Sequence, residues 1–95
     1  MEKKCRIEVT KLAEKQLSRL PNEILEAFLC WEQTIMVHGL RKMRMSRGYR
    51  DEALKGVRTI QRSSRLNRSY RIIYREVTSV EFVVICILEV NKHEY

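Results

Sequence analysis

The C-terminus carries two side chains that could transfer protons. His93 and Tyr95 are separated by one residue, so both would lie on one face if the chain continues there as a strand. An imidazole with an ordinary pKa of about 6.5 can accept and donate a proton near neutral pH, and the adjacent Lys92 adds a positive charge. This spacing fits a site of acid–base chemistry, and it also fits an ordinary surface histidine.

Positive charge is concentrated in the middle of the chain. Residues 40–75 hold twelve Lys or Arg against Asp51 and Glu52, a net charge of +10 (12 − 2). The first 39 residues are neutral, with six charges of each sign, and residues 76–95 carry −3 (1 − 4). A merely solubilising surface would mix the two signs. The block therefore predicts binding to a polyanion, above all nucleic acid, and its arginines suit bidentate contacts with phosphate.

Length and composition indicate one small soluble domain spanning residues 1–95, with 44% hydrophobic and 33% charged residues. Neither a membrane span nor a signal peptide is expected, because long apolar runs are absent. Cys5, Cys30 and Cys86 lie in apolar stretches without a CxxC pair, which predicts reduced, buried thiols and no metal site. We expect a cytoplasmic protein without a cofactor.

The first half of the chain predicts a strand followed by two helices. Residues 5–9 alternate between apolar and polar, as in a strand with one buried face. Thr10 can cap a helix that Pro21 ends, and Asn22 can cap a longer helix that ends at Gly39. The apolar stripe of the longer helix recurs at helical spacing and consists of Ile24, Phe28, Trp31 and Ile35.

The second half predicts strands. Residues 40–56 lack periodicity and contain turn residues, so we expect a basic loop with room for one short helical turn. Strands are expected over 58–66 and 70–76, joined by a turn at 67–69, and over 80–90, which is apolar on both faces. The order is β-α-α-β-β-β. The fold class is therefore α+β, with two N-terminal helices packed on a small, mainly antiparallel sheet.

Three stretches follow one another in a recognisable order and spacing. They are residues 54–56 (LKG), 61–74 (QRSSRLNRSYRIIY) and 89–95 (EVNKHEY), preceded by Leu20-Pro21, Trp31 and the segments 39–42 and 48–52. Together they resemble the RelE/ParE superfamily of toxins from type II toxin–antitoxin systems. The resemblance is strongest to the RelE/HigB-like mRNA interferases that end in a KHEY or KHDY tail. It covers nearly the whole chain and implies the RelE-like microbial RNase fold.

The resemblance also implies an activity and its residues. Toxins of this kind cut mRNA, usually in the ribosomal A site and without a metal, by attack of a 2′-hydroxyl on the adjacent phosphate. Such chemistry needs a base, an acid and cations around the phosphorane. The implied catalytic residues are Arg65, Arg71, His93 and Tyr95. Arg71 would stabilise the phosphorane, His93 would act as acid or base, and Tyr95 would stack on a base or share the proton transfer.

The implied RNA contacts are Lys55, Arg58, Arg62, Arg68 and Lys92. Two departures from the family pattern concern the strand between the loop and the turn. Ser63 and Arg65 stand where some members have a lysine pair, and an arginine does not deprotonate usefully, so the general base stays unassigned. Ser64 stands where an apolar residue is expected.

The resemblance implies two partners: a cognate acidic antitoxin, with which the chain could form a hetero-oligomer, and mRNA in the ribosomal A site. No membrane partner is expected. Two other readings stay open. A ParE-like toxin has the same fold and inhibits DNA gyrase instead of cutting RNA, and the His–Tyr tail argues against this alternative. A non-catalytic nucleic-acid-binding module would need the basic face but not His93.

Overall fold

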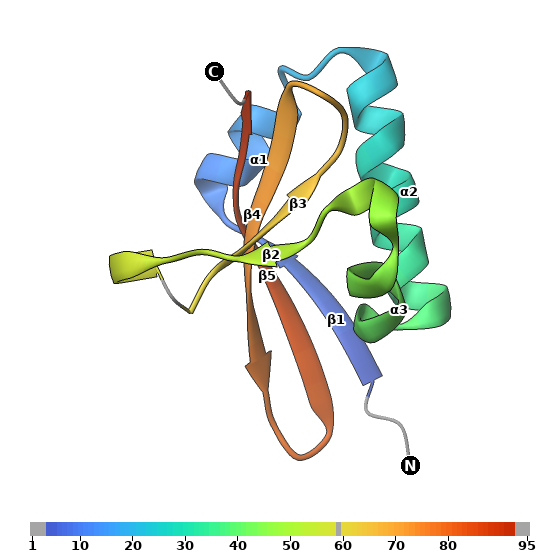
Figure 1. Cartoon of the computed structure of the whole chain (residues 1–95), viewed down its shortest axis with the longest axis vertical. Coiled ribbons are helices and arrows are strands. Elements are labelled where there is room, and N and C mark those ends of the chain that lie inside the picture. The colour runs from blue at the N-terminus through green and yellow to red at the C-terminus, as the bar shows by residue number, and fades with distance from the viewer. Residues whose placement is uncertain (1–3, 59, 93–95) are drawn as a thin grey trace.

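A five-stranded mixed sheet forms the centre of the computed structural model, which describes residues 4–58 and 60–92 (Figure 1). The strand order is β1-β5-β4-β3-β2, so β5 lies between β1 and β4. Only the β1–β5 pair is parallel, and the other three pairs are antiparallel. The strands are β1 (Lys4–Val9), β2 (Glu52–Ala53), β3 (Arg62–Arg65), β4 (Tyr70–Thr78) and β5 (Phe82–Lys92).

Two helices occupy the positions that the sequence predicts. Helix α1 (Lys11–Leu17) begins at Thr10, whose hydroxyl accepts a hydrogen bond from Ala13 N at 3.1 Å, so that cap is confirmed. Helix α2 (Asn22–His38) is capped by Pro21 without a side-chain hydrogen bond, so the prediction of Asn22 as the cap is wrong. Proline serves because its fixed φ already suits a helix start. None of the described helices is long and apolar enough to cross a membrane.

The segment that was expected to be a loop is more ordered than its sequence indicates. It forms α3 (Leu40–Met45), the short 3₁₀ helix η1 (Arg47–Tyr49) and β2. Gly39 has φ of +90° and turns the chain between α2 and α3, after which Leu40 and Met43 are buried one turn apart. Helix α3 is too short to show a full apolar period, which explains why the sequence pattern missed it.

The strands after β2 differ from expectation mainly at their ends. The strand predicted over 58–66 is confined to β3, because Gly56–Arg58 form a second 3₁₀ helix, η2. The turn at 67–69 is confirmed, since Asn67 Oδ1 accepts hydrogen bonds from the backbone N of Ser69 and Tyr70. Strand β5 is shifted by two residues from the predicted 80–90. Each change moves an element end and leaves the sheet order intact.

The core lies between one face of the sheet and the helices α2 and α3. Trp31 of α2 is fully buried, stacks near Phe28, and meets the Tyr74 ring edge-on at a centroid distance of 5.5 Å. Helix α1 contributes the buried Ala13 to this core and flanks the far end of β5, where Gln16 Oε1 accepts a hydrogen bond from Val90 N at 2.7 Å. This contact satisfies part of the β5 edge beyond the end of β1.

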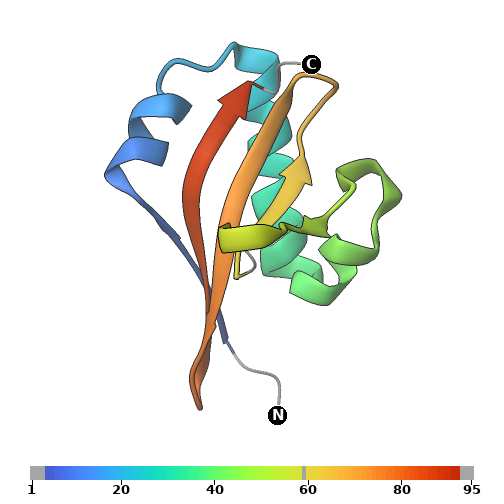
Figure 2. The same cartoon turned by 60° about the vertical axis from the view of Figure 1, so that its left-hand side comes forward.

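The opposite face of the sheet is open in the described part of the chain. Figure 2 shows α2 behind the sheet, while η2 crosses in front of β4. One side-chain prediction fails in detail. Cys30 is exposed on α2 and is not a buried thiol, although all three cysteines are free. Among the methionines, Met43 is buried, whereas Met36 and Met45 are 52% and 71% exposed.

Candidate functional site

A cavity of about 380 Å³ opens on the uncovered face of the sheet. Its floor comes from β3, β4 and β5, and its rim comes from the segment around η2. We call it the Arg71 cavity. Its lining residues are Leu54, Arg58, Ser63, Arg71, Ile73, Asn91 and Lys92. Three of them carry positive charge, two are polar and uncharged (Ser63 and Asn91), and two are apolar (Leu54 and Ile73).

Arg71 of β4 lines this cavity and is held by side chains of two other strands. Its Nη1 donates hydrogen bonds to Glu52 Oε1 of β2 and to Ser63 Oγ of β3, each at 3.1 Å. The Arg71 side chain is 20% exposed and that of Glu52 is 61% exposed, so the pair lies at the mouth of the cavity. An anchored guanidinium that still reaches solvent is well suited to bind a phosphate.

A second group of polar side chains lies beside Arg71. Arg58 Nη2 donates to Glu89 Oε2 at 3.3 Å, and Asn91 Nδ2 donates to the same oxygen at 2.8 Å. Arg58 Nε donates to Gln61 Oε1 at 2.8 Å, which fixes the guanidinium from the other side. Each of the two arginines that line the cavity is therefore paired with a carboxylate, Arg71 with Glu52 and Arg58 with Glu89, and such pairs can bind an anion and accept a proton.

The other predicted residues fall into three groups. Arg65 is the register partner of Arg71 on the same face, and Arg68, Lys55 and Lys92 are half-exposed or exposed around it. Arg62 does not join them, because it lies on the opposite face of β3, where its Nε donates to Asp51 Oδ1 at 2.6 Å. His93 and Tyr95 lie outside the described residues, immediately after Lys92.

The sequence analysis missed Glu52, Ser63, Glu89 and Asn91 as site residues. One signal was available for Glu52, which is one of only two acidic residues in the basic block. Ser63 was marked only as a departure from the family's lysine pair, and no comparable signal marked Glu89 or Asn91. Glu89 lies in an apolar strand. Its contact with Arg58 depends on how η2 folds over the sheet, which the sequence pattern does not show.

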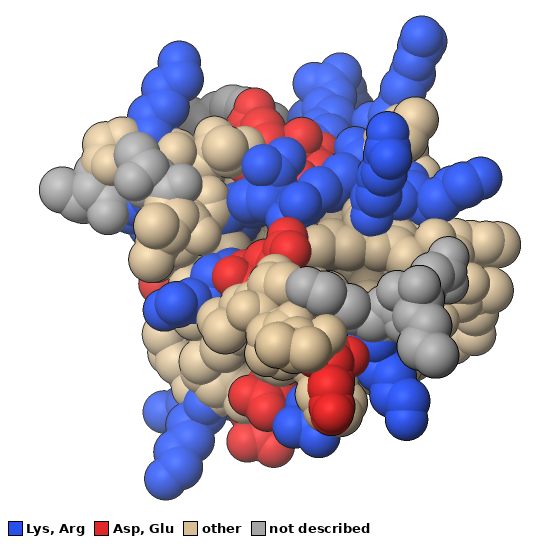
Figure 3. All heavy atoms as spheres, turned by 90° about the horizontal axis from the view of Figure 1, so that it is seen from below, with Lys and Arg blue, Asp and Glu red and all other residues tan. Residues whose placement is uncertain are grey.

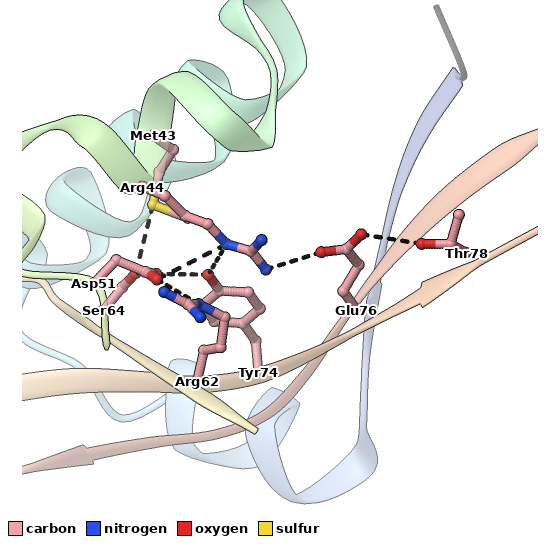
Figure 4. Close-up of polar contacts among 8 residues, drawn as sticks. All are labelled: Met43, Arg44, Asp51, Arg62, Ser64, Tyr74, Glu76 and Thr78. Carbon is pink, nitrogen blue, oxygen red and sulfur yellow. Dashed lines mark hydrogen bonds and ion pairs between the residues drawn. The ribbon is translucent and has the colours of Figure 1, made fainter. Parts of the chain in front are cut away.

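Behind the sheet, Asp51 forms the centre of a buried polar cluster (Figure 4). Its side chain is fully buried and accepts hydrogen bonds from Arg62, Ser64 and Tyr74, the last two at 2.5 Å. Arg44 of α3 completes the cluster by donating to Tyr74 Oη at 3.2 Å and by pairing with Asp51 at 3.8 Å. The buried carboxylate is thus neutralised and fully hydrogen-bonded, as burial requires.

This environment changes the acidity of Tyr74. Burial raises the pKa of Tyr74 to about 12, and the hydrogen bond to the Asp51 carboxylate adds to the rise, against an opposing effect of Arg44. Tyr74 is therefore a neutral donor to Asp51 at physiological pH. Its role in this cluster is structural, as its position in the core indicates.

Basic side chains also gather at the end of the molecule where α2 meets α3. In Figure 3, Lys and Arg crowd the upper part of the view toward the right, and acidic residues lie beside them at the top centre and again near the bottom. A groove of about 1030 Å³ lies there, and we call it the α2–α3 groove. Its wall is apolar at Met36, Val37 and Val83, and its charged lining includes Lys4, Arg41, Lys42, Arg44 and Glu76.

Comparison with known proteins finds neither a matching family model nor a matching curated protein, but it does find solved structures with the same fold. A YoeB/ParE toxin from Agrobacterium tumefaciens superposes with a TM-score of 0.73 at 15% identity, over 94% of this chain and 99% of that one. The archaeal RelE–RelB complex from Pyrococcus horikoshii OT3 gives 0.70 at 24%, over 94% of each chain. The YoeB dimer from Staphylococcus aureus gives 0.68 at 18%, over 97% and 99%.

Proposed function

We propose that this chain, which has the fold of the RelE/ParE-superfamily toxins, is itself a type II toxin that cuts mRNA on the ribosome. One observation carries the proposal. Arg71 is anchored between Glu52 and Ser63 on the open face of the sheet, in a cavity whose rim includes Lys92, the residue before His93. The basic block supplies the electrostatic attraction to RNA.

The reaction we propose is a transesterification within the RNA strand. The 2′-hydroxyl loses its proton to a base and attacks the adjacent phosphorus. A phosphorane with additional negative charge forms, and the bond to the 5′-oxygen then breaks as that oxygen gains a proton. The products are a 2′,3′-cyclic phosphate and a 5′-hydroxyl. Arg71 stabilises the phosphorane, because a fixed cation at the developing charge lowers the barrier.

Glu52 is the best candidate for the base. An arginine cannot serve, and among the described residues Glu52 is the carboxylate that directly contacts Arg71. A phosphate bound by Arg71 would place the neighbouring 2′-hydroxyl beside it. Glu89 accepts hydrogen bonds from Arg58 and Asn91 and is better placed to fix Arg58 over the cavity. His93 then acts as the acid for the 5′-oxygen, with Tyr95 beside it.

The remaining cations would guide the RNA into the cavity. Arg65 lies opposite Arg71 in the β3–β4 register, and Arg68 is exposed in the following turn. Arg58 and Lys92 line the cavity, and Lys55 is exposed directly before η2. Arg62 is excluded from this role by its contact with Asp51. We assign to these side chains contacts with mRNA or ribosomal RNA phosphates, which set affinity more than sequence preference.

We also propose a cognate antitoxin that neutralises this charge. Two of the similar structures are complexes, RelE with RelB and the toxin–antitoxin pair YafQ with DinJ. In this chain the α2–α3 groove joins an apolar wall to Lys4, Arg41 and Lys42, which suits an amphipathic segment with acidic flanks. Co-expression with the product of the adjacent small reading frame should restore growth and yield a co-purified complex.

Induced expression is the direct test of the proposed activity. Wild-type protein should arrest growth, and sequencing of RNA 5′ ends should reveal new cuts within translated messages. Folded Arg71→Ala protein should give neither effect. A ParE-like toxin would instead block supercoiling by purified gyrase and leave messages intact, so the same cells and a gyrase assay separate the two functions.

A further inference from the structure

We propose that Asp51 is a positioning residue for the candidate active site, acting through its neighbour Glu52. The inference rests on the proposed function, because it concerns the same Arg71–Glu52 pair. Asp51 touches neither Arg71 nor the cavity lining. The Asp51 side chain lies on the core side of the sheet, where it contacts Arg62. The side chain of the next residue, Glu52, lies on the open side, where it contacts Arg71.

Strand β3 shows the same division between its two faces. Ser63 Oγ accepts from Arg71 on the open face, whereas its neighbours Arg62 and Ser64 both donate to Asp51 on the core face. In the register, Glu52 is paired with Ser63. Asp51 therefore binds β3 from the core face at Arg62 and Ser64, the two residues that flank Ser63. Because Glu52 follows Asp51 in the chain, these contacts also fix the position of Glu52 on the open face.

Strand β2 needs such an anchor because its own pairing is minimal. It consists of two residues at the edge of the sheet and pairs with β3 only. So short a ladder provides few backbone hydrogen bonds to define the position of Glu52. The four side chains around Asp51 come from α3, β3 and β4, so the carboxylate ties this edge to the rest of the fold (Figure 4).

The backbone just before Asp51 supports this assignment. Arg50 has φ of +41° and ψ of +49°, and it is the one non-glycine residue with positive φ in the described part of the chain. A left-handed conformation costs an L-residue about 1–2 kcal/mol. This unfavourable conformation occurs in the turn that places the Asp51 side chain in its cluster. Backbone strain of this kind concentrates at functionally constrained sites.

A double-mutant cycle tests the proposal. Asp51→Asn should lower single-turnover cleavage by about 10–100-fold, since a displacement of about 1 Å at a catalytic group can cost that much. In a Glu52→Gln background, Asp51→Asn should lower the cleavage rate by less than about 2-fold more, because Asp51 acts on the rate only by positioning Glu52. Ile35→Val, a core change of α2, is the matched control and should leave the rate unchanged in both backgrounds.

A second readout does not depend on RNA cleavage. The guanidinium ¹⁵N resonances of Arg71 should move in Asp51→Asn and in Glu52→Gln but not in Ile35→Val. If Asp51→Asn does not fold, Ser64→Ala keeps the charge and should move the same resonances less far. The proposal is wrong if the Arg71 signals stay in place, or if Asp51→Asn lowers the rate equally with and without Glu52. A wild-type protein that cuts no RNA would refute the proposed function and leave the resonance test valid.

Discussion

Arg71 of β4 and Glu52 of β2 meet across β3, with 3.1 Å between Nη1 and Oε1, although they are nineteen positions apart in the sequence. The pair lies at the mouth of the cavity and is partly exposed, so its contribution to stability is small. In the reaction proposed above its importance is chemical, because the pair would place a cation for the phosphorane beside a base for the 2′-hydroxyl.

Substitution of either partner should therefore separate activity from stability. Arg71→Ala and Glu52→Gln should each reduce RNA cleavage by about 10²–10⁴-fold, as expected for loss of a charge-stabilising or acid–base group. Thermal unfolding should change little. Cleavage by single-turnover assay and melting by circular dichroism check both effects, and Glu81→Gln, on the turn before β5, serves as the control for loss of a carboxylate.

The C-terminal tail should carry chemistry instead of stability. His93 lies beyond Val90, the last buried residue of β5, so His93→Ala should change stability by no more than about 0.5 kcal/mol. Cleavage and toxicity should be lost, and deletion of Glu94-Tyr95 should act in the same direction. If His93→Ala unfolds the protein, the histidine is structural, and if the variant stays fully active, its assignment as the acid is wrong.

The arginines of β3 and of the following turn should behave differently on substitution. Arg68→Ala should weaken RNA binding and reduce the slope of log affinity against log salt by about 0.7–0.9 from a wild-type slope of about −3 to −5. Arg62→Ala should keep that slope but lower the free energy of unfolding by about 3 kcal/mol, because Asp51 loses its nearest cation. If wild type and Arg68→Ala show equal slopes of log affinity against log salt, the turn at residues 67–69 does not contact RNA.

Alkaline pH should destabilise the protein through Tyr74. The pKa of Tyr74 is about 12 in the folded state and 10.0 ordinarily. Between pH 10 and pH 12 the folded protein therefore keeps a proton on Tyr74 that the unfolded chain releases. The stabilisation is complete below pH 10 and is lost as pH rises toward 12. Urea unfolding should show a loss of about 1–3 kcal/mol in this range that Tyr74→Phe lacks. Tyr70→Phe, which leaves the cluster intact, should retain the loss.

The sequence predicted the parts of the fold whose patterns are long. The alternation in β1, the apolar stripe of α2 and the apolar run of β5 each repeat often enough to define their elements. Strand β2 has two residues and α3 has six, so neither contains a readable period. Their presence follows from burial of Leu40 and Met43 and from the hydrogen bonds of Asp51, which are tertiary contacts.

The candidate site was predictable only in its cations. Arg65 and Arg71 share a face because strand residues of that parity pair across the turn. The carboxylate beside Arg71 was not predictable, since it depends on the return of the chain from α3 to the sheet edge. The position of Arg62 was not predictable for the same reason. Arg62 belongs to the basic block by sequence, but its side chain donates a hydrogen bond to Asp51 on the core side of the sheet.

We propose that this chain cuts mRNA by attack of a 2′-hydroxyl at the Arg71 cavity. The most direct measurement is cleavage of a defined message in a reconstituted translation reaction, with the chemical nature of both new ends determined. We expect wild-type protein to produce 5′-hydroxyl and 2′,3′-cyclic phosphate ends, and folded Arg71→Ala and Glu52→Gln proteins to produce almost none. Intact message with folded wild-type protein, or cuts that persist unchanged in Arg71→Ala, would contradict the account.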